Sequence, residues 1–297
     1  MTNYYELVDA NKARSGVVIA FFIAFVTAAT YLICYSLGFD YSAVGIVLII
    51  SGLLSFASYY YSDQMILSIQ GAVPANKKDH FDFYTVAENL CGPAGIPMPK
   101  LYVINDPSPN AFATGRDPEH AVVCATTGLL QKLNRTELEG VIAHEMSHIR
   151  NYDTRLMGIV AILIGMITLL ADILLRTRIR GRSDRDEGNF GAILFIAGLI
   201  MALLSPLIAQ LIQLAISRRR EFLADASGAS ITKYPEGLAS ALEKISKDDE
   251  PLMSANKATA HLFIADPLKN QKGSVSWFSN FFNTHPPVAE RIKALRS

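Results

Sequence analysis

The sequence places two histidines, His144 and His148, four residues apart, with Glu145 directly after the first. On a helix, side chains four residues apart lie on the same face, so both imidazoles can reach one cation. The pattern therefore predicts a zinc site in which Glu145 takes a proton from a water in the open coordination position. Zinc lowers the pKa of such a water to about 7 and polarises a carbonyl, so the predicted chemistry is peptide hydrolysis.

A third ligand is needed, because HExxH alone also occurs where two histidines lie on the surface of a soluble helix. Glu221 is followed four residues later by Asp225, and on a helix the two carboxylates share a face. Glu221 is then the candidate metal ligand, and Asp225 accepts the other ring N–H of a ligating histidine. Taken alone, this stretch would more readily be a solvated acidic pair beside the arginines at 218–220.

The HExxH pattern falls on a predicted helix. Thr136 with Glu139 three residues later has the spacing of a capping box, and the apolar residues Leu138, Val141 and Ile142 follow at helical intervals. We therefore expect a helix that begins just before Leu138 and carries both histidines.

Four separated motifs are shared with a known family. They are 110–115, 144–148, 219–225, and Thr284–Pro287 with Arg291–Ile292. In this combination and order the chain resembles the HtpX family of membrane-bound zinc metalloproteases over nearly its whole length. The resemblance implies a gluzincin-type endopeptidase with one Zn²⁺ per chain. It also implies a stress-related quality-control role, the degradation of damaged or misfolded membrane proteins at the cytoplasmic membrane.

The resemblance implies that a short edge strand pairs with the extended substrate. Its residues would be Asn110, Ala111, Phe112, Ala113 and Thr114. Pairing through the main chain suits an enzyme of low sequence specificity. Without the resemblance, this stretch would be interpreted as a surface loop.

The resemblance also suggests two catalytic residues near the end of the chain. His285 precedes two prolines that stiffen the backbone, and Arg291 lies six residues after it. Both would stabilise the oxyanion of the tetrahedral intermediate.

The composition indicates a membrane protein. Of the 297 residues 51% are hydrophobic and only 18% charged, and the mean hydropathy is +0.25. A net charge of zero gives no basic stripe, so we expect no nucleic-acid partner. Three cysteines, Cys34, Cys91 and Cys124, form neither a disulfide framework nor a CxxC pair, which fits a reducing compartment.

Uncharged blocks of 25 and 22 residues, at 15–39 and 41–62, predict a hairpin of two membrane spans, since a span needs about 20 residues. A cleaved signal peptide would have a shorter apolar region of about 7–15 residues. Lys12 and Arg14 precede the hairpin and lysines follow it at 77–78, so the positive-inside rule places both its ends in the cytoplasm.

A second hydrophobic hairpin, 156–217, separates His148 from Glu221. One metal must bind both residues, so the chain between them crosses the membrane an even number of times or not at all. A crossing places the arginine-rich loop 176–185 outside, against the positive-inside rule. However, the uncharged block 190–217 would be about 42 Å long as a helix, enough to cross a ~30 Å hydrocarbon core. We therefore expect this hairpin to span the membrane.

Residues 63–155 have the pattern of an α/β domain. Helical spacing over 81–90 ends at a glycine- and proline-rich run that starts at Cys91. Short β-rich runs at Leu101–Ile104 and Ala121–Ala125, together with the proposed edge strand, predict a small sheet before the zinc helix.

The expected architecture is α+β and mostly helical. About four transmembrane helices, in hairpins 1–62 and 156–217, carry a cytosolic gluzincin-like domain assembled from 63–155 and 218–297. The second part of that domain contains a helix beginning near Tyr234. Lipid and membrane-protein substrates bound as extended strands are the expected partners.

Two other functions fit parts of the pattern. A CAAX-type prenyl-protein peptidase shares the zinc motifs, but that branch is expected to carry about seven spans. A non-enzymatic membrane scaffold would use zinc structurally, and structural sites are normally closed by a fourth protein ligand. Two histidines and one glutamate leave a coordination position open, which favours an enzyme.

Overall fold

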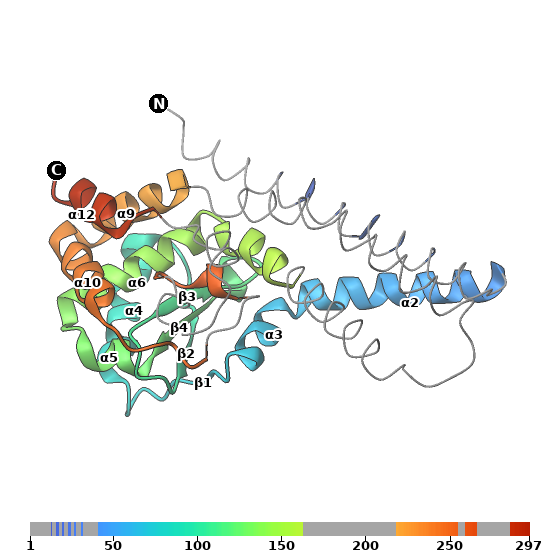
Figure 1. Ribbon diagram of the computed structural model, residues 1–297, viewed down its shortest axis with the longest axis horizontal. Coiled ribbons are helices and arrows are strands. Elements are labelled where there is room, and N and C mark those ends of the chain that lie inside the picture. Colours follow the sequence, from blue (N-terminus) through green and yellow to red (C-terminus); the bar gives the residue numbers. More distant parts are fainter. Residues whose placement is uncertain are drawn as a thin grey trace, which may run out of the picture.

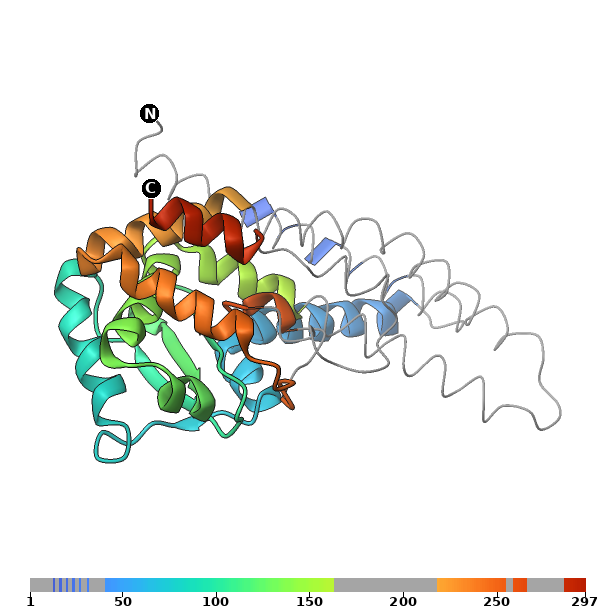
Figure 2. The ribbon, with the colours of Figure 1, turned by 60° about the vertical axis from the view of Figure 1, so that its left-hand side comes forward.

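The computed structural model describes residues 41–162, 218–254, 259–265 and 286–297, together with single positions between 13 and 31. Helix α2 (Tyr41–Tyr60) runs outward from an α+β body (Figures 1 and 2). Its large apolar side chains are exposed, among them Ile46, Leu53 and Phe56. Within the described ranges, no helix combines the length and apolarity of a membrane span. Of the predicted spans, 163–217 and most of 15–39 lie outside the described residues.

The body contains a four-stranded mixed sheet with the order β1-β2-β4-β3. Its strands are β1 (Val73–Pro74), β2 (Lys100–Ile104), β3 (Ala111–Thr114) and β4 (Val122–Thr126). β2 and β4 pair in parallel, and the other two pairs are antiparallel. The three predicted strands are confirmed to within one residue, and β3 lies at an edge as expected. Strand β1 was not predicted, because two residues ending in proline carry no strand pattern.

Helix α4 (Phe81–Ala94) is longer than predicted, because it continues past Cys91 and includes Pro93. Proline in the last turn removes only one helical hydrogen bond. The end is set instead by Gly95, which adopts a left-handed conformation with φ of 67°. Its N–H and that of Ile96 both donate to the Cys91 carbonyl, at 2.9 and 3.2 Å.

Helix α6 (Arg135–Arg150) carries both histidines, as predicted, but its capping box was assigned wrongly. The N-cap is Asn134, whose Oδ1 accepts from the Glu137 N–H at 2.9 Å, while the Glu137 carboxylate accepts from the Asn134 N–H at 2.8 Å. Thr136 and Glu139 lie inside the helix. The sequence contains two overlapping capping-box patterns, Asn134 with Glu137 and Thr136 with Glu139, and asparagine is as good an N-cap as threonine.

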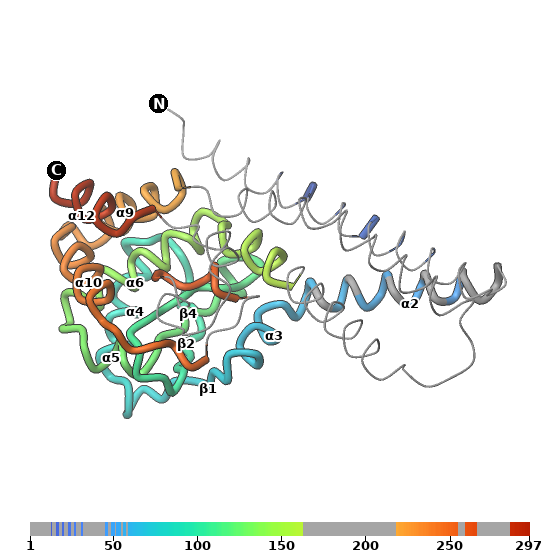
Figure 3. The backbone as a smooth tube through the Cα atoms, viewed as in Figure 1, coloured from blue at the N-terminus to red at the C-terminus, as the bar shows by residue number. Residues whose placement is uncertain are grey.

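The almost fully buried helix α6 is the centre of the body (Figure 3). It packs against α4, β3, α9 (Arg218–Thr232) and α10 (Pro235–Lys247), and α12 (Val288–Leu295) packs on α9 and α10. The helix predicted to begin near Tyr234 is thus confirmed. Gly228 permits the close approach of α9 to α6, since a Cβ there would lie 3.1 Å from the main-chain nitrogen of His144. This contact sets α9 directly against the HExxH turn.

Shorter elements complete the described structure. They are α3 (Ser62–Ile69), η1 (Pro118–His120), α5 (Thr127–Lys132), a helical stretch at 153–162, and η2 (Ala260–Leu262).

Candidate metal centre

The two histidines of α6 lie where the helical spacing predicts. Their Nε2 atoms are 3.2 Å apart, and the rings are nearly perpendicular at 89°. Both side chains are buried. The first turn of α9 adds Glu221, with Oε1 at 3.6 Å from Nε2 of His148 and Oε2 at 3.8 Å from Nε2 of His144.

These three residues form a group whose ligand atoms lie within 4.8 Å of one another. Two ligands that are each ~2.05 Å from a tetrahedral zinc ion lie about 3.3 Å apart, so the observed spacings fit such an ion. The structure therefore brings together His144, His148 and Glu221, the three residues predicted as ligands.

The outer ring nitrogens show which way the histidine lone pairs point. Nδ1 of His144 lies 2.9 Å from Oδ1 of Asp225, and Nδ1 of His148 lies 3.1 Å from Oδ2 of Asp153. In its neutral form each imidazole donates its Nδ1 proton to a carboxylate, which leaves the lone pair on Nε2. Two lone pairs and the Glu221 carboxylate then converge on one point. They repel each other there unless a proton or a metal ion lies between them, so this donor set fits a metal.

Each of these two carboxylates also faces an arginine. Asp225 accepts two hydrogen bonds from Arg291, at 2.9 Å from Nε and 2.7 Å from Nη2. Asp153 lies 3.6 Å from Nη1 of Arg220. Both arginines are buried, so these charges are held in a medium where they interact more strongly than in water.

Arg291 has a geometry different from the one expected of an oxyanion donor. The side chain is fully buried, and besides Asp225 it contacts Glu221 at 3.6 Å and donates to the Ile264 carbonyl at 3.2 Å. Its guanidinium therefore lies against the groups that hold His144. The other residue assigned this role, His285, lies outside the described residues.

Asp153 and Arg220 were not identified from the sequence. Asp153 comes five residues after His148, beyond the end of α6, and helical spacing alone does not bring it back to the ring. The chain turns at Tyr152, whose φ of 58° is unusual for a bulky residue. In the sequence, this contact could be suspected only from an aspartate that comes just after the helix with the two histidines.

Glu145 is buried beside the donor group, with its carboxylate close to the main-chain N–H of Ala113 in β3. Burial, with the nearby charge of Glu221, raises the pKa of Glu145 to about 7 against the opposing charges of His148 and Arg291. Burial also lowers the pKa of His148, but Asp153 and Glu221 outweigh it and raise that pKa to about 9. A bound divalent cation would favour the ionised glutamate and the neutral histidine.

The predicted substrate strand lies next to this glutamate. Ala111, Phe112, Ala113 and Thr114 form β3 and are all buried. Asn110 directly precedes the strand, and its side-chain amide binds the main chain of Ala265.

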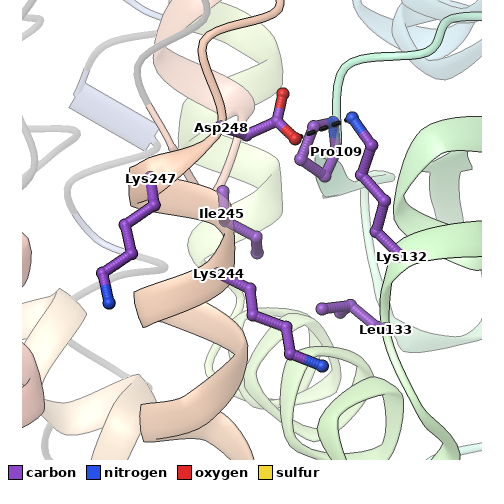
Figure 4. Close-up of a pocket in the computed structure, with 7 residues that line it drawn as sticks. All are labelled: Pro109, Lys132, Leu133, Lys244, Ile245, Lys247 and Asp248. Carbon is purple, nitrogen blue, oxygen red and sulfur yellow. Dashed lines mark hydrogen bonds and ion pairs between the residues drawn. The ribbon is translucent and has the colours of Figure 1, made fainter.

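A separate cavity of about 300 Å³ contains none of the metal-donor residues (Figure 4). It is lined by Pro109, Lys132, Leu133, Lys244, Ile245, Lys247 and Asp248. Each of its lysines has a carboxylate partner within 3 Å, as in the 2.6 Å pair of Lys132 with Asp248. Its cationic groups are thus balanced, and it contains no candidate catalytic group.

Comparison with known proteins assigns the family. Residues 79–297 match the family model described as Peptidase family M48. The chain belongs to this family. With the His–His–Glu donor group in place, it is a metalloprotease of family M48.

Several relatives match the chain over almost its whole length. A protein named Protease HtpX homolog from Caldanaerobacter subterraneus subsp. tengcongensis is 45% identical, over 99% of this chain and 97% of the relative. One of the same name from Dictyoglomus thermophilum is also 45% identical, over 99% and 94%. The crystal structure of S. mikatae Ste24p matches with 17% identity and a TM-score of 0.46. That match covers 97% of this chain and 66% of Ste24p, just under two thirds of its length.

Proposed function

We propose that this M48 protease is a zinc endopeptidase of the cytoplasmic membrane, which hydrolyses peptide bonds of misfolded or damaged membrane proteins on the cytosolic side. The observation that supports the chemistry is the donor set itself. Two Nε2 atoms and one carboxylate converge at spacings that fit zinc, and a buried glutamate lies beside them. Among the described residues this group has three members, whereas a structural zinc site normally has four protein ligands.

Zinc bound by His144, His148 and Glu221 would supply a Lewis acid with an open position for water and for the substrate carbonyl. Glu145 acts as the general base, accepts a proton from the attacking water and later delivers it to the leaving amine. Burial favours this shuttle, because it brings the pKa of Glu145 close to neutral before the metal's own charge is added.

The other buried residues hold the ligands in place. Asp225 and Asp153 fix the tautomers of His144 and His148, and Arg291 and Arg220 hold these two carboxylates. We assign Arg291 to this positioning role because of its contacts. His285 keeps the proposed role of donor to the oxyanion, which rests on the sequence resemblance.

Membrane insertion is proposed from the apolar segments. The uncharged blocks at 15–39 and 190–217 have the length of spanning helices. Helix α2 presents Ile46, Leu53 and Phe56 to its surroundings with 60–66% of their surface exposed, an arrangement that lipid favours and water disfavours. Hairpins 1–62 and 156–217 would then hold the catalytic parts 63–155 and 218–297 at the cytosolic surface.

The substrate class is tested in cells. Membrane proteins are compared by quantitative mass spectrometry between cells producing the wild-type protein and cells producing Glu145→Gln. A quality-control protease predicts that a set of membrane proteins, above all damaged ones, accumulates with the variant. Identical membrane proteomes would contradict the proposal, and accumulation restricted to uncleaved prenylated proteins would favour a CAAX-type peptidase.

A further inference from the structure

The outward-facing main-chain groups of β3 can be identified from its pairing with β4. In an antiparallel pair, residues alternate between those hydrogen-bonded to the partner strand and those facing away. The Thr126 N–H donates to the Asn110 carbonyl at 2.9 Å, and the register pairs Phe112 with Cys124 two residues further on. The main-chain groups of Ala111 and Ala113 therefore face away from β4, toward the outer edge of β3. A substrate strand would pair at this outer edge.

One of these two positions is already paired within the protein. The Ile264 N–H donates to the Ala111 carbonyl at 2.9 Å. The Asn110 side chain makes two hydrogen bonds with the main chain of Ala265, the residue after Ile264. It donates to the Ala265 carbonyl at 3.0 Å and accepts from the Ala265 N–H at 3.3 Å. Residues 264–265 thus lie along β3 in the position of an added strand.

The residues before Ile264 anchor this segment in the core. Phe263 is fully buried and packs edge-on against Phe112, with ring centroids 5.1 Å apart. Leu262, at the end of η2 beside β3 (Figure 1), is also buried, and Arg291 binds the Ile264 carbonyl. Displacing residues 262–265 from β3 would expose the buried side chains of Leu262 and Phe263 and break several hydrogen bonds at once.

The second position, Ala113, lies beside the catalytic glutamate, whose carboxylate is close to the Ala113 main-chain N–H. We propose that Phe263–Ala265 is a fixed stop on β3, so that a substrate pairs with the strand only at Ala113 and turns away before Ala111. This inference rests on the proposed function, in which β3 binds extended substrates. It predicts that substrate residues on one side of the scissile bond gain no main-chain pairing with β3, so recognition on that side is short.

Hydrogen exchange tests whether the stop is fixed, without any need for turnover. The full-length Glu145→Gln protein, loaded with zinc in detergent, is measured with and without a twelve-residue unstructured peptide. The Ile264 amide should be strongly protected in both states. Rapid exchange without peptide, or loss of protection when peptide binds, would overturn the proposal. If the wild-type enzyme cleaves no peptide at all, the proposed function fails, yet the exchange of Ile264 still decides whether the segment is fixed.

A peptide-length series tests the consequence for substrates. One cleavable core peptide is extended by one to four residues at either end, and kcat/KM is measured. Extension at one end should raise kcat/KM, and extension at the other should change it less than about twofold. Equal gains at both ends would show that nothing stops the chain at Ala111.

A pair of variants at Ile264 separates the pairing from the packing. Ile264→Pro removes the N–H that pairs with Ala111 and opens the carbonyl to substrate, so extension at the previously insensitive end should now raise kcat/KM, on the order of five- to tenfold for one main-chain hydrogen bond. Ile264→Val keeps the amide and should retain the wild-type pattern. Should Ile264→Pro fail to fold, as shown by its thermal transition, the wild-type and Ile264→Val series still decide the question.

Discussion

Asp153 should control how tightly the protein holds zinc, although it does not itself contact the metal. Its carboxylate accepts the Nδ1 proton of His148 at 3.1 Å and is 1% exposed. Replacement by Ala removes this acceptor, so the ring can rotate or carry its proton on Nε2, the atom that must bind the metal. It also removes the negative charge that faces Arg220.

The magnitude follows from the kind of contact. Partners of metal-bound histidines typically contribute 10- to 100-fold in metal affinity, about 1.4–2.7 kcal/mol. Asp153→Ala should lie in this range, because the acceptor and its charge are both lost and water cannot easily replace them at a buried position. Asp153→Asn keeps an acceptor oxygen and loses only the charge, so its loss should be less than about tenfold.

The assay is competition for zinc between each purified variant and a fluorescent chelator. Asp82→Ala is the matched control, because Asp82 also forms a charged contact, with Nη1 of Arg135 at 2.9 Å, but on the surface and away from the metal-donor residues. Zinc affinity of Asp153→Ala equal to that of Asp82→Ala would contradict the positioning role of Asp153. Circular dichroism on both variants separates a loss of affinity from a loss of folding.

Three further outcomes are expected. Gly140→Ala places a Cβ 2.5 Å from the Leu238 main-chain nitrogen and should lower the free energy of unfolding, measured by urea titration, by about 1–3 kcal/mol. In the control Gly92→Ala the new Cβ meets no atom within 4 Å, so stability should not fall, and equal stabilities of the two variants would contradict this packing. Because the pKa of His148 is raised to about 9, zinc binding at neutral pH must displace its proton, so zinc affinity measured by competition should increase as the pH rises toward 9; an affinity independent of pH would contradict it. In a variant without the native cysteines, Ser183→Cys should react with a membrane-impermeant thiol reagent on intact cells, and labelling only after lysis would place the loop 176–185 in the cytosol.

The two histidine donors could be predicted because their geometry is local: four-residue spacing on a helix brings His144 to His148 whatever the rest of the fold does. Glu221 could be named from its own motif with Asp225, but its approach to the histidines depends on the packing of α9 against α6. The strands could be predicted for a similar reason, since short β-rich runs between turn residues have few other structures open to them.

The remaining contacts depend on chain geometry that no local pattern records. Asp153 contacts His148 from beyond the end of α6, after a turn in which Tyr152 has a left-handed conformation. Ile264 pairs with a strand about 150 residues earlier in the sequence, and its neighbours carry no strand alternation. Arg291 was predicted to be functional, but its orientation toward Asp225 depends on how α12 packs on α9.

The roles of the metal and of the base Glu145 can be separated experimentally at this one site. Zinc content and peptide hydrolysis are measured for the wild-type protein, Glu145→Gln and Glu221→Ala after removal of metal by chelation and return of one equivalent of zinc. Chelation should abolish wild-type activity, and zinc should restore it. Glu145→Gln should bind one zinc but lose roughly 10²–10⁴-fold in kcat, and Glu221→Ala should lose both metal and activity. Undiminished hydrolysis by the chelated wild-type protein or by zinc-loaded Glu145→Gln, or full zinc content in Glu221→Ala, would contradict these roles.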